Sequence, residues 1–149
     1  FGDRSVPKLI IIDEAWQLLR GANTADFIET GYRRARKYGG SYITITQSVM
    51  DFFREDNAGV GQAIISNSAF KFLLVQKRED LKRARDEGKL ALSDFEARLA
   101  ETVHTVPGKY SEIFVKSDRA YGVGRLFVDK FTQYLYNTKP GVVQYLENK

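Results

Sequence analysis

The sequence contains no cysteine, only one histidine and no long apolar run. The lack of cysteine excludes disulfides, thiol catalysis and cysteine-ligated zinc, and it leaves the redox compartment open. His104 alone cannot form a histidine-based metal cluster, so we interpret it as a structural or surface residue. No apolar run approaches the roughly 20 residues that a membrane-spanning helix needs. We also find no signal-peptide pattern, and an opening at Phe1 is consistent with a piece cut from a longer protein.

The remaining composition is that of an ordinary globular domain. The chain has 149 residues, of which 43% are hydrophobic and 28% are charged. This length is enough for one domain with a real core. The net charge of +4 leaves contact with nucleic acid or anionic lipid open but demands neither, because acids and bases alternate in most places.

The most informative stretch is an apolar run that ends in two acids. Residues 9–12 read Leu-Ile-Ile-Ile, and Asp13 and Glu14 follow directly. A continuous apolar run with β-branched residues is typical of a strand buried on both faces of a parallel sheet. Because buried carboxylates are costly, we expect both acids to lie where the strand emerges, at its carboxyl end. Ligands of open α/β sheets bind at that edge.

Two adjacent acids at such an edge suit nucleotide hydrolysis. One carboxylate can hold a hydrated Mg²⁺, while the next orients or deprotonates the attacking water. The run followed by Asp13 and Glu14 is a Walker B pattern. The alternative is that both acids only cap the helix that follows, and this stretch by itself leaves both interpretations open.

A second strand is predicted to end beside the first. Asn23 and Thr24 form a helix-capping pair, helical spacing continues to about Tyr38, and a Gly-Gly pair follows. Residues 41–47 are rich in β-branched and aromatic residues and end in Gln47. This strand–helix–strand spacing fits a right-handed βαβ unit with parallel strands. Gln47 should therefore meet both acids at one edge.

The remainder of the chain mixes helices and strands. We predict a loop with a short helix over 51–62, with a further turn or two of helix over 62–67. A capping box joins Ser93 to Glu96. The apolar residues Phe131, Tyr134 and Leu135 share one helix face and are interpreted as core. The other predicted elements are a strand over 69–76, a charged helix from Arg78 that Gly88 ends, a helix from Ser93 to about Val103, a hairpin of 110–116 with 121–128, and helices from Asp129 and over 142–147.

Three motifs in order carry a family resemblance. Residues 9–16 read Leu-Ile-Ile-Ile-Asp-Glu-Ala-Trp, residues 33–40 read Arg-Arg-Ala-Arg-Lys-Tyr-Gly-Gly, and residues 45–48 read Ile-Thr-Gln-Ser. The chain resembles the P-loop ATPases of conjugative type IV secretion, in particular the TraC-like pilus-assembly ATPases of the HerA/FtsK-like branch. The resemblance covers essentially the whole chain. It implies an α/β fold, a partial RecA-like P-loop NTPase sheet (the Walker B half) with a C-terminal β-hairpin and helices.

The resemblance also implies roles for individual residues. Asp13 would hold Mg²⁺ through water, and Glu14 would be the catalytic base. Gln47 would contact the γ-phosphate of ATP or the lytic water. Arg36 would act as an arginine finger on the neighbouring subunit, with Arg33 as the substitute candidate. The alternative for Arg36 is that it only complements the dipole at the helix C-terminus.

One departure from the family pattern is severe. The 149 residues contain no Gly-x-x-x-x-Gly-Lys-Ser/Thr loop, so the amides, lysine and hydroxyl that cradle phosphates are missing. We therefore expect a C-terminal portion of an ATPase domain that is inactive by itself, with RecA-like elements in 1–76 and a helical and hairpin part in 77–149. The strand before the missing loop would lie between the strands at 41–47 and 69–76. We predict that the gap is closed by re-pairing, by a second copy or by partial disorder.

The leading hypothesis is a fragment of an ATPase that powers pilus assembly and conjugative DNA or protein transfer. The alternatives are a DNA-pumping translocase or coupling protein of the same superfamily, and a non-catalytic docking or regulatory module of the secretion machine. The resemblance implies a hexameric parent with ATP and Mg²⁺ as cofactors. It also implies other secretion components as partners and a place in the bacterial cytoplasm, peripheral to the inner membrane.

Overall fold

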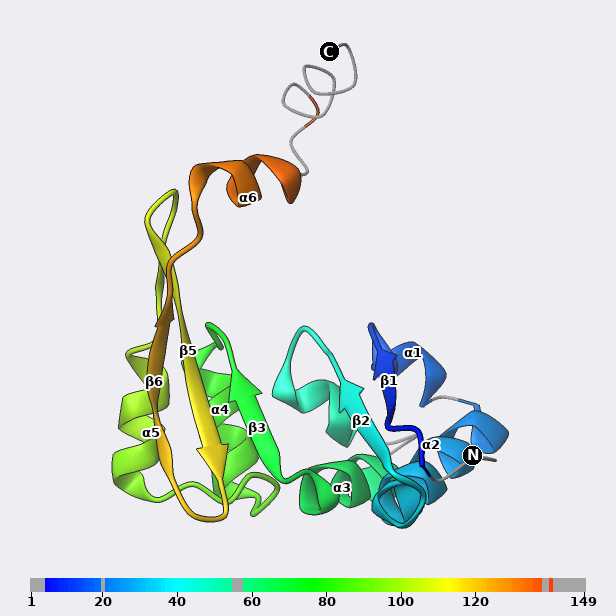
Figure 1. Cartoon of the computed structure of the whole chain (residues 1–149). Coiled ribbons are helices and arrows are strands. Elements are labelled where there is room, and N and C mark those ends of the chain that lie inside the picture. Colours follow the sequence, from blue (N-terminus) through cyan, green and yellow to red (C-terminus); the bar gives the residue numbers. More distant parts are fainter. Residues whose placement is uncertain (1–4, 20, 55–57, 138–139, 141–149) are drawn as a thin grey trace.

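A computed structural model describes residues 5–19, 21–54, 58–137 and 140 as a mixed α/β fold with two sheets (Figure 1). In chain order the elements are β1 (Lys8–Ile12), α1 (Ala15–Leu18), α2 (Ala22–Arg34), the 3-10 helix η1 (Ala35–Tyr38), β2 (Gly40–Thr44), the 3-10 helix η2 (Val49–Phe53), α3 (Ala58–Asn67), β3 (Phe70–Leu73), α4 (Arg78–Asp86), α5 (Asp94–Glu101), β4 (Thr105–Val106), β5 (Tyr110–Ser117), β6 (Tyr121–Leu126) and α6 (Lys130–Leu135).

The first sheet pairs β1 with β2 in parallel, as the βαβ spacing predicts. The register runs from Lys8 opposite Gly40 to Ile12 opposite Thr44, and α2 with η1 connects the two strands. Gly39 ends the helical connection with φ of 64°, a left-handed conformation that glycine adopts without steric cost. The parallel arrangement is confirmed, and it places the carboxyl ends of both strands at the same edge (Figure 1).

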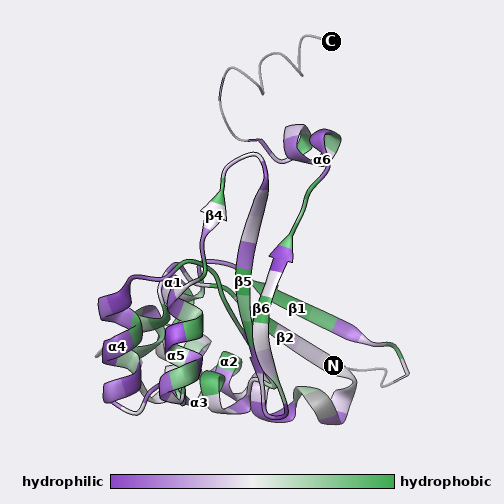
Figure 2. Ribbon diagram, turned by 90° about the vertical axis from the view of Figure 1, so that its left-hand side faces the viewer, coloured by the Kyte–Doolittle hydropathy of each residue, from purple (hydrophilic) through white to green (hydrophobic). Residues whose placement is uncertain are grey.

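The second sheet is antiparallel and contains the predicted hairpin. β5 lies in the centre, pairs with β3 and β4, and forms the hairpin with β6. α4 and α5 cover one face of this sheet (Figure 1, Figure 2). The two-residue strand β4 was not predicted from the sequence, because two residues carry no measurable alternation.

Two buried carboxylates tie this second sheet to its neighbours. Glu96 of α5 accepts a hydrogen bond from Lys116 Nζ and also from the backbone N–H of Ser93, in the predicted capping box. Burial raises the pKa of Glu96, but the hydrogen bonds from Lys116 and Ser93 outweigh it and leave the pKa below its ordinary value. Glu112 accepts two bonds from Arg125, which hold its pKa below the ordinary range.

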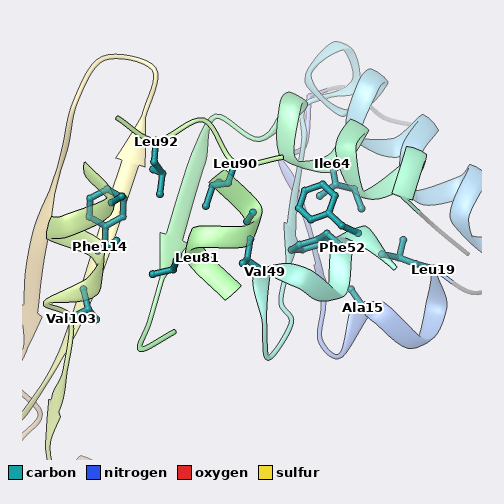
Figure 3. Close-up of a cluster of buried hydrophobic side chains, with 14 of the residues drawn as sticks. Ala15, Leu19, Val49, Phe52, Ile64, Leu81, Leu90, Leu92, Val103 and Phe114 are labelled. Carbon is teal, nitrogen blue, oxygen red and sulfur yellow. The ribbon is translucent and has the colours of Figure 1, made fainter. Parts of the chain in front are cut away.

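A single buried core connects the two sheets. It lies on one side of both sheets and includes side chains from α1, η2, α3, α4 and β5 (Figure 3). The largest fully buried side chains are Phe114, Leu19, Ile28, Ile64, Leu81 and Leu90. η2 lies between β2 and β3 in Figure 1, and the side chains of η2 and α3 belong to this core.

The opposite face of the first sheet is exposed, which corrects the expectation that its first strand is buried on both faces. The side chains of Leu9 and Ile11 are 59% and 58% exposed, whereas Ile12 is buried. After Lys8, β1 is nevertheless apolar (Figure 2). The prediction of a strand is confirmed, but within the described residues only one of its two faces is covered.

The edges that face the gap are also open. Within the described residues, β2 pairs only with β1, and β3 pairs only with β5. Re-pairing of these two edges within the chain was one of the predicted outcomes, and it is wrong for this structure. Association with a second copy is not tested by a single chain and stays a prediction.

Several element boundaries differ from the sequence expectation. α2 begins at Ala22 with Gly21 at its N-cap, so the proposed capping pair Asn23–Thr24 lies inside the helix. α3 is longer than expected and begins at Ala58, because its two glycines suggested a loop. The C-terminal helix predicted over 142–147 lies outside the described residues.

The carboxyl-terminal helix α6 stands apart from the core. It lies beyond the end of the antiparallel sheet opposite the hairpin turn (Figure 1, Figure 2). The side chains of Phe131, Tyr134 and Leu135 are 75%, 54% and 62% exposed, so their assignment to the core is wrong for this structure. None of the described helices has the length and apolar character needed to cross a membrane.

Candidate active site at the carboxyl edge of the parallel sheet

The site begins at the sharp turn that follows β1. Asp13 is exposed and its Oδ1 accepts a hydrogen bond from the backbone N–H of Glu14 at 2.9 Å. Glu14 has φ of 49° and ψ of 41°, a left-handed conformation that is costly for a side chain other than glycine. It is the only non-glycine residue with positive φ in the described part of the chain. Such strain concentrates at functional sites, where the surrounding structure enforces it.

The surrounding structure enforces this turn through backbone contacts with β2. The N–H of Ile45 donates to the carbonyl of Ile12 at 2.9 Å, and the N–H of Ala15 donates to the carbonyl of Ile45 at 3.1 Å. Ala15 is completely buried, so α1 is fixed against the core immediately after the two acids. The two acids are therefore held at the edge where β2 also ends.

Gln47 meets Glu14 at this edge, as the sequence predicted. The Nε2 of Gln47 donates to Oε1 of Glu14 at 2.8 Å, although the two residues are 33 positions apart. Gln47 follows the end of β2 and both side chains lie on the accessible side of the sheet edge. A carboxylate and an amide in contact at the carboxyl edge of parallel strands form a site where a ligand can be bound and a proton accepted.

Two further residues of the site were missed by sequence reasoning. Trp16 donates its indole N–H to Oε2 of Glu14 at 2.6 Å. The guanidinium of Arg54 lies 4.8 Å from the centre of the Trp16 ring. The position of Trp16 directly after the acids was a visible signal, but the contact of Arg54 depends on the tertiary fold.

The loop after Gln47 is anchored from three directions. Ser48 and Asp51 form a capping box at the start of η2, with the N–H of Ser48 donating to Asp51 Oδ2 at 3.0 Å. The hydroxyl of Ser48 donates to Oδ2 of Asp80 on α4 at 3.0 Å. Gln76 accepts from the N–H of Val49 at 3.2 Å. These contacts fix the backbone that carries Gln47 against the elements of the second sheet.

The two arginine candidates lie at the opposite end of the parallel strands. α2 and η1 end where β2 begins, whereas the acids follow the carboxyl end of β1 (Figure 1). Five strand residues separate these edges by roughly 16 Å. Arg33 pairs with Glu29 at 2.8 Å and is 59% exposed. Arg36 lies in η1, and its side chain is outside the described part of the structure, so its role stays a prediction.

The residues at this edge fit one half of a magnesium and nucleotide site. Proteins usually bind Mg²⁺ through one or two carboxylates completed by substrate phosphates and water. The exposed carboxylate of Asp13 matches this requirement. No group of three or more candidate metal ligands occurs among the described residues, so these would not form a metal site without phosphate oxygens. The glycine-rich loop that cradles phosphates is not part of the 149 residues.

Comparisons with known proteins agree with this geometry. The chain is 42% identical to Protein TraC of Escherichia coli (strain K12) over 79 residues, which are 52% of this chain and 9% of that protein. Its fold is similar to the structure of VirB4 of Thermoanaerobacter pseudethanolicus, with a TM-score of 0.65 and 26% identity. That match covers 87% of this chain and 33% of the VirB4 chain. The chain thus spans only a small part of each relative.

These relatives confirm the resemblance to the P-loop ATPases of conjugative type IV secretion, and the likeness to VirB4 confirms the fold class. The sequence model of a P-loop domain family matches residues 3–143, which is nearly the whole chain. The match includes both strands of the parallel sheet, the two acids and Gln47. The chain therefore belongs to the TraG P-loop domain family.

Proposed function

We propose that this chain is the Walker B portion of an ATPase that powers pilus assembly and conjugative transfer by a type IV secretion system. The observation that carries the proposal is the hydrogen bond between Gln47 and Glu14, at the carboxyl edge of a parallel sheet. It brings two of the groups that nucleotide hydrolysis needs into one place. The similarity to TraC and VirB4 supports the same assignment.

Each residue of the site has a proposed role in hydrolysis. Asp13 would hold Mg²⁺ together with the phosphates of ATP, and the metal would supply charge neutralisation. Glu14 accepts the proton of the attacking water at Oε1 or Oε2. Gln47 would orient that water or contact the γ-phosphate, and its hydrogen bond to Glu14 supports a place beside the base.

The position of the arginine candidates favours action between subunits. η1 and the end of α2 lie at the far end of β2 from the acids, which supports action of these arginines on another subunit. We propose that Arg36 reaches the site of a neighbouring subunit in a hexamer, with Arg33 as substitute. Such a finger contributes about 10³–10⁵ in rate. The division of the chain into RecA-like elements in residues 1–76 and a helical and hairpin part in residues 77–149 is also part of this proposal.

The decisive experiment measures ATP hydrolysis by a polypeptide extended upstream to include a phosphate-binding loop. Glu14→Gln should lower kcat by roughly 10²–10⁴ and retain nucleotide binding, because it removes only the general base. Arg36→Ala should also abolish turnover without loss of binding. Mixing the two inactive variants should restore part of the activity, because the finger of one subunit completes the site of another.

A variant outside the site controls for the loss of a surface charge. Lys82→Ala on α4 removes an exposed cation whose partner Asp86 lies 3.9 Å away, and it should leave hydrolysis unchanged. If the extended wild type neither binds nor hydrolyses ATP, the motor assignment fails. A mixture of Glu14→Gln and Arg36→Ala that stays inactive would contradict the finger acting between subunits.

A second candidate is a docking or regulatory module of the secretion machine. It is favoured by the exposed apolar and aromatic side chains of α6 and the segment before it, which include Phe127 at 68% exposure. Exposed apolar clusters of this kind mark interaction surfaces. Binding of this chain to other secretion components at the inner membrane, with no nucleotide turnover in the extended protein, would support it. The DNA-pumping alternative gains nothing from α4, whose cations pair with nearby acids.

A further inference from the structure

The carboxylate of Glu14 is held from two sides. Its Oε1 accepts from the amide of Gln47 at 2.8 Å, and its Oε2 accepts from the indole of Trp16 at 2.6 Å. The Gln47 bond is exposed, whereas the Trp16 bond is partly buried. Hydrogen bonds to a charged group are strong, and shielding from water strengthens them further. The Trp16 hydrogen bond is therefore expected to be the stronger of the two.

Trp16 is itself held in place by the loop that carries Gln47. The guanidinium of Arg54 lies over the Trp16 ring, and its Nη2 donates to Oδ1 of Asp51 at 2.8 Å. Asp51 is 9% exposed and its other oxygen accepts from the N–H of Ser48. Because Ser48 follows Gln47, the two donors to Glu14 are joined in one closed circuit of contacts.

We propose that Trp16 is a positioning residue that fixes the rotamer of Glu14 through its indole N–H. This inference deepens the proposed function, since it rests on Glu14 being the base. With Oε2 held by Trp16, Oε1 stays beside Gln47, where an attacking water would be oriented. A base acts efficiently only when its geometry is fixed before the reaction. Phenylalanine at position 16 would keep a ring beneath Arg54 and lose the donor.

The contact can be tested on the 149-residue chain by NMR. Trp16 is the only tryptophan, so the chain gives a single indole N–H resonance. Glu14→Ala removes the acceptor and should move this resonance upfield. Glu14→Gln keeps an acceptor oxygen and should move it less. The matched control Glu29→Ala removes a carboxylate of α2 that pairs with Arg33, and it should leave the resonance in place.

The role can be tested by kinetics of the upstream-extended polypeptide. Trp16→Phe should lower kcat roughly ten- to a hundredfold, which corresponds to the loss of one hydrogen bond to a charged group. The KM for ATP should change little, because the hydrogen bond that is lost is made to the carboxylate of Glu14, the proposed general base. Arg54→Lys keeps a cation over the ring and should lower kcat by less than Trp16→Phe does.

The outcomes separate this inference from the proposed function. An indole resonance that stays in place in Glu14→Ala overturns the contact. Full kcat in Trp16→Phe, measured in an extended polypeptide that hydrolyses ATP, overturns the positioning role and leaves the ATPase assignment intact. If Trp16→Phe does not fold, Arg54→Ala replaces it in the assay. Full kcat in Arg54→Ala overturns the proposal that the contacts around Trp16 position Glu14. An extended wild type without hydrolysis overturns the proposed function and the role of Trp16 with it.

Discussion

The two sheets of this chain differ in how their strands find their partners. β1 and β2 pair across about 32 positions, as the register of Lys8 with Gly40 shows, and a helix must connect them. β5 and β6 pair across a short turn, with Lys116 opposite Tyr121. Both sheets expose apolar side chains, such as Ile11 on β1 and Phe72 on β3, but β5 in the second sheet buries Phe114 completely. The candidate site lies on the first sheet.

The difference shows which interactions within the described residues hold each sheet. The antiparallel sheet combines the local β5–β6 hairpin with covering helices and with the ion pairs of the buried carboxylates Glu96 and Glu112, although its β3 edge is open. The parallel sheet has only two strands and an exposed apolar face, so its strands gain less from burial within these residues. The candidate site thus combines residues from distant parts of the chain on a sheet of only two strands.

The largest expected effect comes from comparing a buried residue of the second sheet with an exposed residue of the first. Phe114→Ala removes a fully buried ring from the second sheet and should lower the free energy of unfolding by about 3–5 kcal/mol. Ile11→Thr keeps a β-branched residue on the exposed face of β1 and should change it by no more than about 0.5 kcal/mol. Urea denaturation followed by circular dichroism measures both. Equal losses would show that the exposed face is covered in solution.

The next effect tests the packing beneath the site. A Cβ at Gly61 of α3 would lie 1.6 Å from the carbonyl oxygen of Phe52 in η2, whereas a Cβ at Gly59 meets nothing within 4 Å. Gly61→Ala should therefore destabilise the chain by roughly 3 kcal/mol, because the helix must move away from η2. Gly59→Ala on the same helix should stabilise it by up to about 1 kcal/mol. Similar unfolding midpoints for the two variants would contradict this packing.

The smallest effect is an acid dependence to which the buried carboxylates of α5 and β5 contribute. The pKa values of Glu96 and Glu112 lie below the ordinary value of about 4.3, so both contribute full stability above that pH. As the pH falls below about 4.3 toward the lower folded pKa values, protonation removes this stability. The midpoint temperature of thermal unfolding should thus be nearly constant between pH 7 and 5 and should fall below pH 4.3.

A variant of Glu112 and a matched control test this assignment. Glu112→Gln should lower stability at pH 7 and make its fall in acid shallower, because one of the two carboxylates that titrate is gone. Glu79→Gln, at an exposed position of α4, is the matched control and should leave the acid profile unchanged. A Glu112→Gln profile parallel to that of the wild type would exclude Glu112 as a source of the acid dependence.

Sequence patterns predicted elements best where local physics is sufficient. The capping box of Ser93 and Glu96, the hairpin and the parallel pair all occur as expected. Boundaries shifted where local signals compete, as at Gly21, which begins α2 ahead of the better capping residues. The periodicity of Phe131 and Tyr134 identified a helix face correctly, but periodicity cannot tell what covers that face.

The sequence by itself determined the two acids after an apolar strand, the glutamine after the next strand and their common edge, because strand direction and chain connectivity follow from local patterns. Only the tertiary structure decided that Trp16 donates to Glu14 and that Arg54 lies over the Trp16 ring. It also decided which face of β1 is covered. These features depend on side chains and layers that meet through space, and spacing along the chain carries no record of them.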